Sequence, residues 1–422
     1  MADYANTDSV KGQRIVRTQV GDAACGVTQF CCADYDIRLF EGQYPVNGMT
    51  YNSYVIEDEQ LVVLDTVDHS VAELWLDALG AYLAGQGRTP DFLIVQHLEP
   101  DHSACIGKFL AKYPDCKVCI SAVGARMLPN FVPGIAPDRV VTVKAGDQLN
   151  IGSRSLRIVN GAMIHWPEVV MTYDPKSKVF FCADAFGTFN CDEAIGIAEG
   201  TLDAATLENT WLPEAMRYVI NICGKYTTQV SALLEAASKL DISYLAPLHG
   251  PVIDLAKFNP IPAYSTWSSL KPLYPAKVFI PVATLHGNTF AAAGELSAML
   301  EQRGISSTVL RLTSQNLSNA VADCFLYGTT VMMSSSYDAS IMPYMSDLLS
   351  RLKSKGWRDR NVAVVENGSW APCAGALIIK ALADFKDMNV IEPKVTIRTQ
   401  LNEESRAALA LLADNIAGLL KK

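Results

Sequence analysis

The chain has 422 residues, of which 50% are hydrophobic and 19% charged, and this composition excludes a disordered or fibrous protein. At about 100–200 residues per domain, the length predicts two or three domains with sizeable cores. The formal net charge of −9 and the lack of a basic run argue against nucleic-acid binding. No stretch reaches ~18 consecutive apolar residues, so we expect no membrane span, and residues 1–10 lack the pattern of a secretory leader.

Eleven cysteines are scattered through the chain. Their odd number and irregular spacing favour reduced thiols in a cytoplasmic protein over a disulfide framework. Cys116-Lys-Val-Cys119 is the only CxxC pair, and one such pair cannot build a four-thiolate metal site. We interpret the cysteines as buried thiols, with redox sensing as the alternative.

The amino-terminal part of the chain reads as short apolar runs separated by turns, with helices between them. The predicted strands are Tyr51–Ile56, Leu61–Asp65, Asp91–Gln96, Lys117–Ser121, Val140–Val143, Ser155–Val159, Val169–Tyr173, Val179–Ala183 and Ile242–Ala246. The predicted helices are Val71–Leu83 and Ser103–Lys112. Many short strands with few helices predict two packed sheets with helices outside.

A stretch rich in Pro, Ser and Tyr, residues 255–276, is predicted to link a first domain, 1–254, to a second, 277–422. In the second domain apolar strands alternate with helices, which is typical of a doubly wound parallel sheet. The predicted strands are Lys277–Val282, Ser307–Leu312, Thr330–Ser334, Asn361–Val365 and Val390–Thr399. The predicted helices are Thr289–Arg303, Met342–Lys355, Ala374–Phe385 and Asn402–Leu420.

Potential metal ligands recur just after predicted strands of the first domain. Four of them, His97, Glu99, Asp101 and His102, fall within six residues after Asp91–Gln96, where a loop can turn them toward one point. Three more follow on later loops: His165, Asp184 and His249. A single histidine near a strand end is more often a hydrogen-bonded core residue, but the repeated context favours a metal site.

A different loop opens the second domain. After the strand Lys277–Val282 come Thr284, Leu285, His286, Gly287, Asn288 and Thr289, and then a helix. Backbone N–H groups, hydroxyls and a helix amino terminus in this arrangement can cradle a phosphate. The chain lacks the GK[ST] of a nucleoside-triphosphate loop, and an ordinary turn is the alternative reading.

The order HxExDH, His, Asp, His resembles the metallo-β-lactamase superfamily, whose fold is an αββα sandwich with a two-metal site at the strand ends. Most hydrolytic members have His where this chain has Glu99. The Glu variant followed by a flavodoxin-like domain resembles the flavodiiron proteins, and His165-Trp-Pro-Glu168 is also similar to that family. The resemblance implies an α/β protein: an N-terminal metallo-β-lactamase-like sandwich and a C-terminal flavodoxin-like doubly wound sheet.

The resemblance also implies two irons per chain. His97, Glu99 and His165 would bind one iron, Asp101, His102 and His249 the other, and Asp184 would bridge both. Mixed imidazole and carboxylate ligation suits redox-active iron, and an anionic Glu99 should favour the ferric state. In parts of the family water displaces the residue at the position of His102, so its role as a ligand stays open.

FMN is the second implied cofactor. Two further loops resemble those that line the flavin ring: Ser335, Ser336, Tyr337, Asp338 and Ala339, and then Asn367, Gly368, Ser369 and Trp370. Tyr337 and Trp370 are the aromatic candidates, with simple packing as the alternative. Two features depart from the family pattern: Pro281 falls inside the first strand, and Ala371-Pro372-Cys373 replaces the usual paired glycines.

The activity implied is reduction of O2 to water, or of NO to N2O, with electrons relayed through FMN to the iron pair. The family also implies a cytoplasmic, head-to-tail homodimer or a dimer of dimers. Because we find no rubredoxin or flavin-reductase module, we expect an external electron donor, either a rubredoxin-like protein or a flavin reductase. The alternatives are a zinc-dependent hydrolase of the same fold and a flavin electron carrier with a vestigial metal site.

Overall fold

The computed structural model describes residues 12–191 and 202–421, so the segment examined for a leader lies outside it. The chain divides into two compact units, Met1–Ser265 and Thr266–Lys422. Helix α8 (Ile261–Ser268) lies within the segment predicted to be a linker, and the first strand of the second unit, β16 (Tyr274–Ala283), begins before Lys277. The domain limits at single-residue level therefore stay a prediction.

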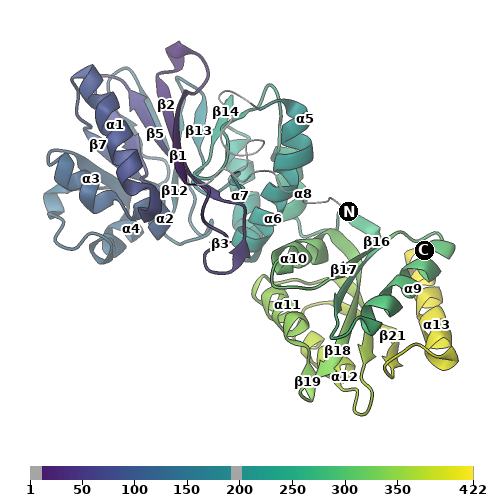
Figure 1. Cartoon of the computed structure of the whole chain (residues 1–422). Coiled ribbons are helices and arrows are strands. Elements are labelled where there is room, and N and C mark those ends of the chain that lie inside the picture. Colours follow the sequence, from purple (N-terminus) through teal and green to yellow (C-terminus); the bar gives the residue numbers. More distant parts are fainter. Residues whose placement is uncertain (1–11, 192–201, 422) are drawn as a thin grey trace. The chain divides into compact units, whose positions relative to one another are not determined.

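The first unit contains two large sheets (Figure 1). One sheet has the order β1-β2-β5-β6-β7-β8-β9, with strands β1 (Gln13–Gln19), β2 (Val27–Asp34), β5 (Met49–Glu57), β6 (Leu61–Leu64), β7 (Phe92–Val95), β8 (Lys117–Ser121) and β9 (Val140–Val143). The other has the order β10 to β15, with strands β10 (Gln148–Asn150), β11 (Ser155–Asn160), β12 (Val170–Asp174), β13 (Val179–Phe181), β14 (Tyr244–Ala246) and β15 (Ile253–Asp254). A separate hairpin pairs β3 (Leu39–Phe40) with β4 (Tyr44–Pro45).

Helices flank this pair of sheets (Figure 1). On the side of the first sheet lie α1 (Ala72–Gln86), α3 (Ile106–Lys112) and α4 (Ala122–Met127), and on the other side lie α5 (Ala204–Thr206), α6 (Leu212–Cys223) and α7 (Thr227–Ala237). The two sheets share one core, in which Tyr54 and Ile94 of the first sheet cluster with Phe181 and Ala246 of the second. Burial of this apolar surface, at about 25 cal/mol per Å², holds the strand ends in place.

The second unit is a parallel sheet in the order β17-β16-β18-β20-β21. Its other strands are β17 (Ser307–Arg311), β18 (Tyr327–Tyr337), β20 (Arg360–Asn367) and β21 (Met388–Ile397), and β19 (Ser340–Ile341) pairs antiparallel with β18. Its helices are α9 (Asn288–Gln302), α10 (Leu317–Leu326), α11 (Pro343–Ser354), α12 (Ala374–Leu382) and α13 (Glu403–Leu420). The strand order is the flavodoxin-like 2-1-3-4-5, whose ligand site lies at the carboxyl ends of the strands.

The predicted strands and helices are confirmed at nearly their expected positions. The predicted helix Ser103–Lys112 is interrupted, because α2 (Pro100–Ser103) ends before α3 begins. The elements without a predicted counterpart are the strands β1, β2, β3, β4, β10, β15 and β19 and the helices α2, α4, α5, α6, α7, α8 and α10. Strand β2 was not predicted because the polar residues Thr28 and Gln29 interrupt its apolar run, although both side chains are buried.

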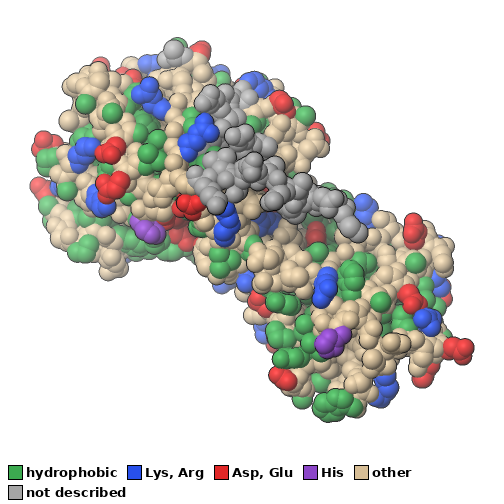
Figure 2. Space-filling view, viewed as in Figure 1, with side chains coloured by type: hydrophobic (Ala, Val, Ile, Leu, Met, Phe, Trp, Pro, Cys, Tyr) green, Lys and Arg blue, Asp and Glu red, His purple; other side chains and the backbone are tan. Residues whose placement is uncertain are grey.

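No helix in the described part of the chain is long and apolar enough to cross a membrane. On the face shown in Figure 2, the described Lys and Arg side chains are scattered among acidic ones and form no continuous basic track. This distribution agrees with the acidic balance of the sequence.

None of the eleven cysteines forms a disulfide, and Cys373 is the only one of them that is not buried. Burial raises the pKa of Cys31, Cys116 and Cys119 to about 12, so these thiols are unreactive. We therefore predict that iodoacetamide labels one thiol per native chain, Cys373. Mass spectrometry of Cys373→Ser should show no label and Cys116→Ser one label; fast labelling of Cys116 or Cys119 would contradict the prediction.

Candidate metal centre and flavin pocket

Loops at strand ends carry the seven predicted ligand residues of the first unit. His97 follows β7, Asp184 follows β13 and His249 follows β14, while His165 lies between β11 and β12. Glu99 is the N-cap of α2, because Pro100 at the first helical position starts the helix there. The helix then carries Asp101 and His102. The ends of β7, β13 and β14, the connection between the antiparallel strands β11 and β12, and one short helix thus bring the seven side chains together.

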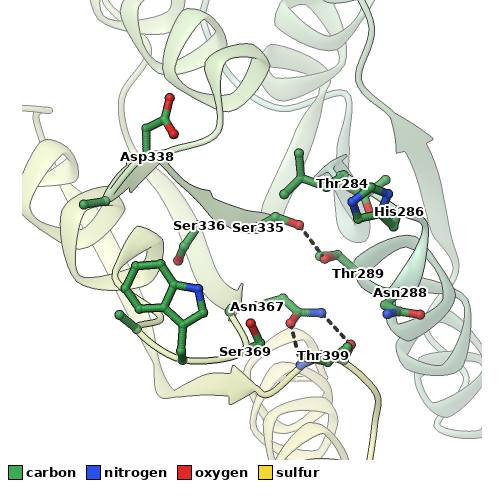
Figure 3. A pocket seen from close by; sticks show the side chains of 15 residues that line it. Thr284, His286, Asn288, Thr289, Ser335, Ser336, Asp338, Asn367, Ser369 and Thr399 are labelled. Carbon is green, nitrogen blue, oxygen red and sulfur yellow. Dashed lines mark hydrogen bonds between the residues drawn. The ribbon is translucent and has the colours of Figure 1, made fainter.

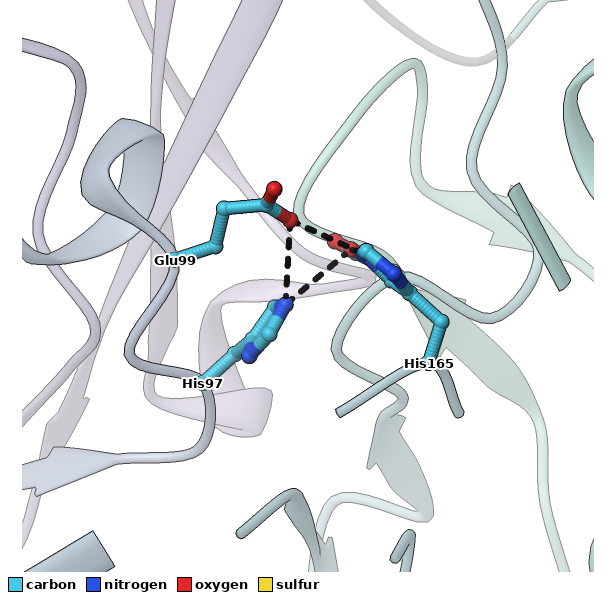
Figure 4. A group of neighbouring side chains, drawn as sticks. His97, Glu99 and His165 are labelled. Atoms are coloured by element: carbon cyan, nitrogen blue, oxygen red, sulfur yellow. Dashed lines mark hydrogen bonds and ion pairs between the residues drawn. The ribbon is translucent and has the colours of Figure 1, made fainter. Parts of the chain in front are cut away.

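The seven residues form two groups that are each suited to one metal ion. In the first group, the Glu99 Oε2 oxygen lies 3.3 Å from His97 Nε2 and 2.9 Å from His165 Nε2 (Figure 4). In the second group, the Asp101 Oδ2 oxygen lies 3.3 Å from His102 Nε2 and 3.2 Å from His249 Nε2. Each group therefore combines two imidazoles with one carboxylate of its own.

The Asp184 carboxylate faces both groups. Its Oδ2 oxygen lies 3.5 Å from His97 Nε2 and 3.3 Å from His165 Nε2. Its Oδ1 oxygen lies 3.1 Å from His102 Nε2 and 3.8 Å from His249 Nε2. This is the arrangement that a carboxylate needs in order to bridge two metal ions, the role that the family resemblance implies for Asp184 and that stays a prediction.

The donor atoms fit a pair of cations. Several are buried without a hydrogen-bond partner: His97 Nε2, His102 Nε2, His249 Nε2, both Asp101 oxygens and Asp184 Oδ1. Burial of polar atoms without partners is unfavourable by about 1–3 kcal/mol each, more for charged groups, and metal coordination removes that penalty. The set contains no thiolate, which argues against a closed structural zinc site.

Three further residues organise the groups, and the sequence analysis assigned none of them. Glu168 is buried and accepts hydrogen bonds from His97 Nδ1 at 2.8 Å and Leu98 N at 3.0 Å. The Thr50 carbonyl accepts from His249 Nδ1 at 2.7 Å. Asp65 accepts from Gln96 N at 2.7 Å and His97 N at 3.3 Å, which fixes the loop after β7. Of these three residues, only Glu168 had a signal in the sequence, because it belongs to the motif His165-Trp-Pro-Glu168.

Aromatic side chains wall the second group. The rings of Phe40, Tyr51 and Tyr218 lie 5.5, 5.7 and 5.7 Å from the His249 ring, respectively. Glu41 follows Phe40 on the β3–β4 hairpin and reaches solvent. The loss of water around its carboxylate, and then the like charge of Glu99, raise the pKa of Glu41 to about 7.

The predicted flavin loops line one pocket at the carboxyl ends of β16, β18 and β20 (Figure 3). The lining residues are Thr284, Leu285, His286, Asn288, Thr289, Ser335, Ser336, Asp338, Ala339, Asn367, Gly368, Ser369, Trp370, Ala371 and Thr399. Two predicted residues, Gly287 and Tyr337, are not in this lining, and the sequence analysis missed Ala371 and Thr399. Of the two aromatic candidates, Trp370 alone faces the pocket.

Hydrogen bonds between the loops shape this pocket. Gly287, at a left-handed φ of 95°, donates its N–H to Thr284 Oγ1 at 3.1 Å and is the N-cap of α9. The Thr289 and Ser335 hydroxyls lie 3.0 Å apart, and Asn367 exchanges two 3.0 Å hydrogen bonds with the Thr399 backbone (Figure 3). The hydroxyls and the helix amino terminus together fit a phosphate monoester.

The departures from the family pattern are accommodated locally. Pro281 lies in register with Leu310 of β17 inside the parallel sheet. In the third loop, Ser336 Oγ accepts hydrogen bonds from Cys373 N at 2.9 Å and Ala374 N at 3.1 Å. A side chain at Gly368 would approach the Cα atom of Pro372 to 2.8 Å, so glycine is required there.

The first unit is a metallo-β-lactamase-like sandwich with two facing ligand groups. The second unit is a flavodoxin-like sheet with a pocket suited to a phosphate. This is the pair of folds that the sequence predicts. Residues 49–250 match the family described as ODP family beta lactamase. The anaerobic nitric oxide reductase flavorubredoxin of Vibrio vulnificus is 25% identical over 387 residues, which cover 89% of this chain and 74% of that protein. The chain spans little more than half the length of the cyanobacterial diflavin flavoproteins that it also matches.

Solved structures give the same result for the fold. The rubredoxin oxygen:oxidoreductase of Desulfovibrio gigas matches with a TM-score of 0.84 at 21% identity, over 96% of this chain and 99% of that one. The flavodiiron protein from Giardia intestinalis matches with a TM-score of 0.84 at 22% identity, over 97% of this chain and 99% of that one. The predicted fold class is confirmed, and the fold of the chain is similar to that of these flavodiiron structures.

Removal of the shared carboxylate should affect both metal positions. We predict that Asp184→Ala lowers the metal content to less than one ion per chain, since each group loses one oxygen of Asp184. Plasma mass spectrometry after dialysis measures this. The control is Asp115→Ala, an exposed aspartate of the same unit, which should keep the wild-type content. Full metal content in Asp184→Ala would contradict the bridging arrangement.

Metal binding should release protons at neutral pH. In the metal-free protein burial would lower the pKa of His102, but the Asp101 and Asp184 carboxylates outweigh it and raise the pKa to about 9. Hydrogen bonds to Asp184 and Glu99 similarly raise the pKa of His165 to about 9 against the effect of burial. Both imidazoles are protonated below about pH 9, whereas a metal ligand must be neutral.

We therefore expect the apparent metal affinity to rise with pH up to about 9, by about tenfold per pH unit for each proton released. Calorimetric titrations at pH 7 in two buffers of different ionisation enthalpy count these protons. The raised pKa values of His102 and His165 also affect the stability of the fold. The two protonated imidazoles stabilise the metal-free protein below about pH 6.5, and this stabilisation is lost as the pH rises through 9. Zero proton release at pH 7 would contradict the prediction.

Trp370 should contribute to flavin affinity. Its side chain is 85% exposed in the pocket wall and is available to stack on a flat ring. Since such stacking is worth about 0.5–1.5 kcal/mol, we predict that Trp370→Ala weakens FMN binding by up to about tenfold. Fluorescence titration of the flavin-free protein measures the dissociation constant. Leu411→Ala removes another exposed apolar side chain of the same unit and should bind FMN as the wild type does.

Proposed function

We propose that the chain is an oxidoreductase that reduces O2 to water, or NO to N2O, with two irons and FMN as its cofactors. The observation that carries this proposal is the position of Asp184, one oxygen toward each of two imidazole and carboxylate groups. The reductase names of its relatives support the class of reaction. The flavin pocket in the same chain supports an electron-transfer role.

In this proposal His97, Glu99 and His165 would hold one iron, and Asp101, His102 and His249 would hold the other. Asp184, with one oxygen toward each group, would serve both. Iron bound there would supply electrons to a diatomic gas, and FMN would replenish them. The Asp184 carboxylate fixes the spacing of the two positions, while Glu168 and the Thr50 carbonyl orient His97 and His249. Phe40, Tyr51 and Tyr218 keep water away from the second position.

The flavin pocket has a matching division of roles. Thr284, the Gly287 turn, Thr289 and Ser335 would bind the phosphate at the amino terminus of α9. Trp370, Ser336 and Asn367 would contact the ring system. The residues that hydrogen bond to one another across the pocket order its loops before a ligand binds, which lowers the entropy lost on binding.

The partners follow from the same proposal. We propose an external electron donor, a rubredoxin-like protein or a flavin reductase, and a head-to-tail homodimer or a dimer of dimers. Eleven free cysteines support a cytoplasmic location, where thiols stay reduced. Sedimentation of the purified protein decides the oligomeric state, and reduction of bound FMN by each candidate donor decides between the two donors.

The metal and flavin content of protein expressed with ample iron and riboflavin tests the proposal. We expect about two irons and one FMN per chain, and O2 or NO consumption when the bound FMN is reduced. The relative rates with the two gases decide which one is the main substrate. His249→Ala should abolish consumption, and His69→Ala, which removes an exposed histidine, should not. Zinc without flavin would overturn the proposal and favour a metal-dependent hydrolase.

A further inference from the structure

The two metal positions differ in what lies behind their imidazoles. Behind His97 is the carboxylate of Glu168, with Oε1 at 2.8 Å from His97 Nδ1. Behind His249 is the neutral carbonyl of Thr50, at 2.7 Å from Nδ1. The Nδ1 atom of the remaining buried ligand, His102, has no hydrogen-bond partner. In the first position, the Nδ1 atom of His97 therefore has an anionic hydrogen-bond partner. In the second position, the Nδ1 atoms of His102 and His249 have none.

The nearest ligands do not compensate for this difference. Glu99 gives the first position one carboxylate of its own, Asp101 gives the second position one, and Asp184 is shared. Each position also has two imidazoles. The partners of the two Nδ1 atoms differ in charge, since Glu168 is a carboxylate and the Thr50 carbonyl is neutral. Glu168 is buried, and its second oxygen, Oε2, has no hydrogen-bond partner. Little of its charge is screened by water.

A carboxylate that accepts from the outer nitrogen of a ligating imidazole makes the other nitrogen a stronger donor. A stronger donor favours the higher charge of a redox-active metal. We propose that Glu168 is a positioning residue that, through His97, makes the first position the one whose iron is oxidised first. When the reduced pair loses one electron to an added acceptor such as ferricyanide, the iron beside His97 passes from 2+ to 3+ and the iron beside His249 stays 2+.

This inference rests on the proposed function, and the two fail in different ways. A wild-type chain without two irons would refute the proposed function. The inference itself is tested in iron-loaded protein by Glu168→Gln, whose amide oxygen still accepts from His97 Nδ1 and Leu98 N but carries no charge. Glu168→Asp keeps the charge and changes the length of the side chain.

The measurement is a redox titration followed by electron paramagnetic resonance, which reports the two one-electron couples of the pair separately. If Glu168→Gln lowers the preference for Fe3+ over Fe2+ at the first position tenfold, the couple of the first oxidation rises by about 59 mV. The other couple should change much less, and Glu168→Asp should stay near the wild type. Equal shifts in both couples, no shift, or a shift in Glu168→Asp as large as in Glu168→Gln would overturn the inference.

Iron binding gives a second readout in case Glu168→Gln does not hold both ions. Fe2+ titration of the metal-free variant should show one of its two sites weakened about 10–100-fold and the other unchanged. Equal weakening of both sites would overturn the inference. The matched control is Glu57→Gln, a carboxylate bonded to Gln86 at the far end of β5, about 23 Å along the strand from Thr50. It should change neither the couples nor the affinities.

Discussion

Five of the seven ionisable side chains at the strand ends of the first unit are buried, and Glu99 and His165 are partly buried. This burial of charged groups is the constraint on which the rest of the site depends. Buried carboxylates and imidazoles are stable only when their charges are paired and their polar atoms are satisfied. The Asp184 oxygens meet that condition partly, by facing two imidazoles each. The remaining partnerless atoms require cations, so the sandwich core and the metal ions stabilise each other.

The proximity of the seven predicted ligands could be expected from the sequence, because part of their signal is local. His97, Glu99, Asp101 and His102 stand within six residues after an apolar strand, and the parallel strands β13 and β14 place Asp184 and His249 at the same sheet edge. The structure brings all seven into two groups as the resemblance implied, although their function as ligands stays a prediction. Pattern, spacing and family likeness were sufficient for this part.

The outer partners could not be predicted, because their contacts join distant parts of the chain. Glu168 lies 71 residues from His97, and Thr50 lies 199 residues from His249. Thr50 also acts through its backbone carbonyl, which has no signature in the sequence. Strand β2 was missed for a related reason: Thr28 and Gln29 are polar in sequence, and only the covering elements show that they are buried. In the second unit, Thr399 enters the pocket through two backbone hydrogen bonds to Asn367.

The separate hydrophobic cores of the two units have a thermodynamic consequence. Leu64 and Phe181 belong to the core of the first unit, whereas Ile280 and Leu412 belong to that of the second. A chain built in this way does not have to melt in a single all-or-none transition. A ligand that binds only the folded form of one unit raises the melting temperature of that unit by mass action. Two transitions in a heat capacity scan are therefore the expected result, one sensitive to the metal supply and the other to the flavin supply.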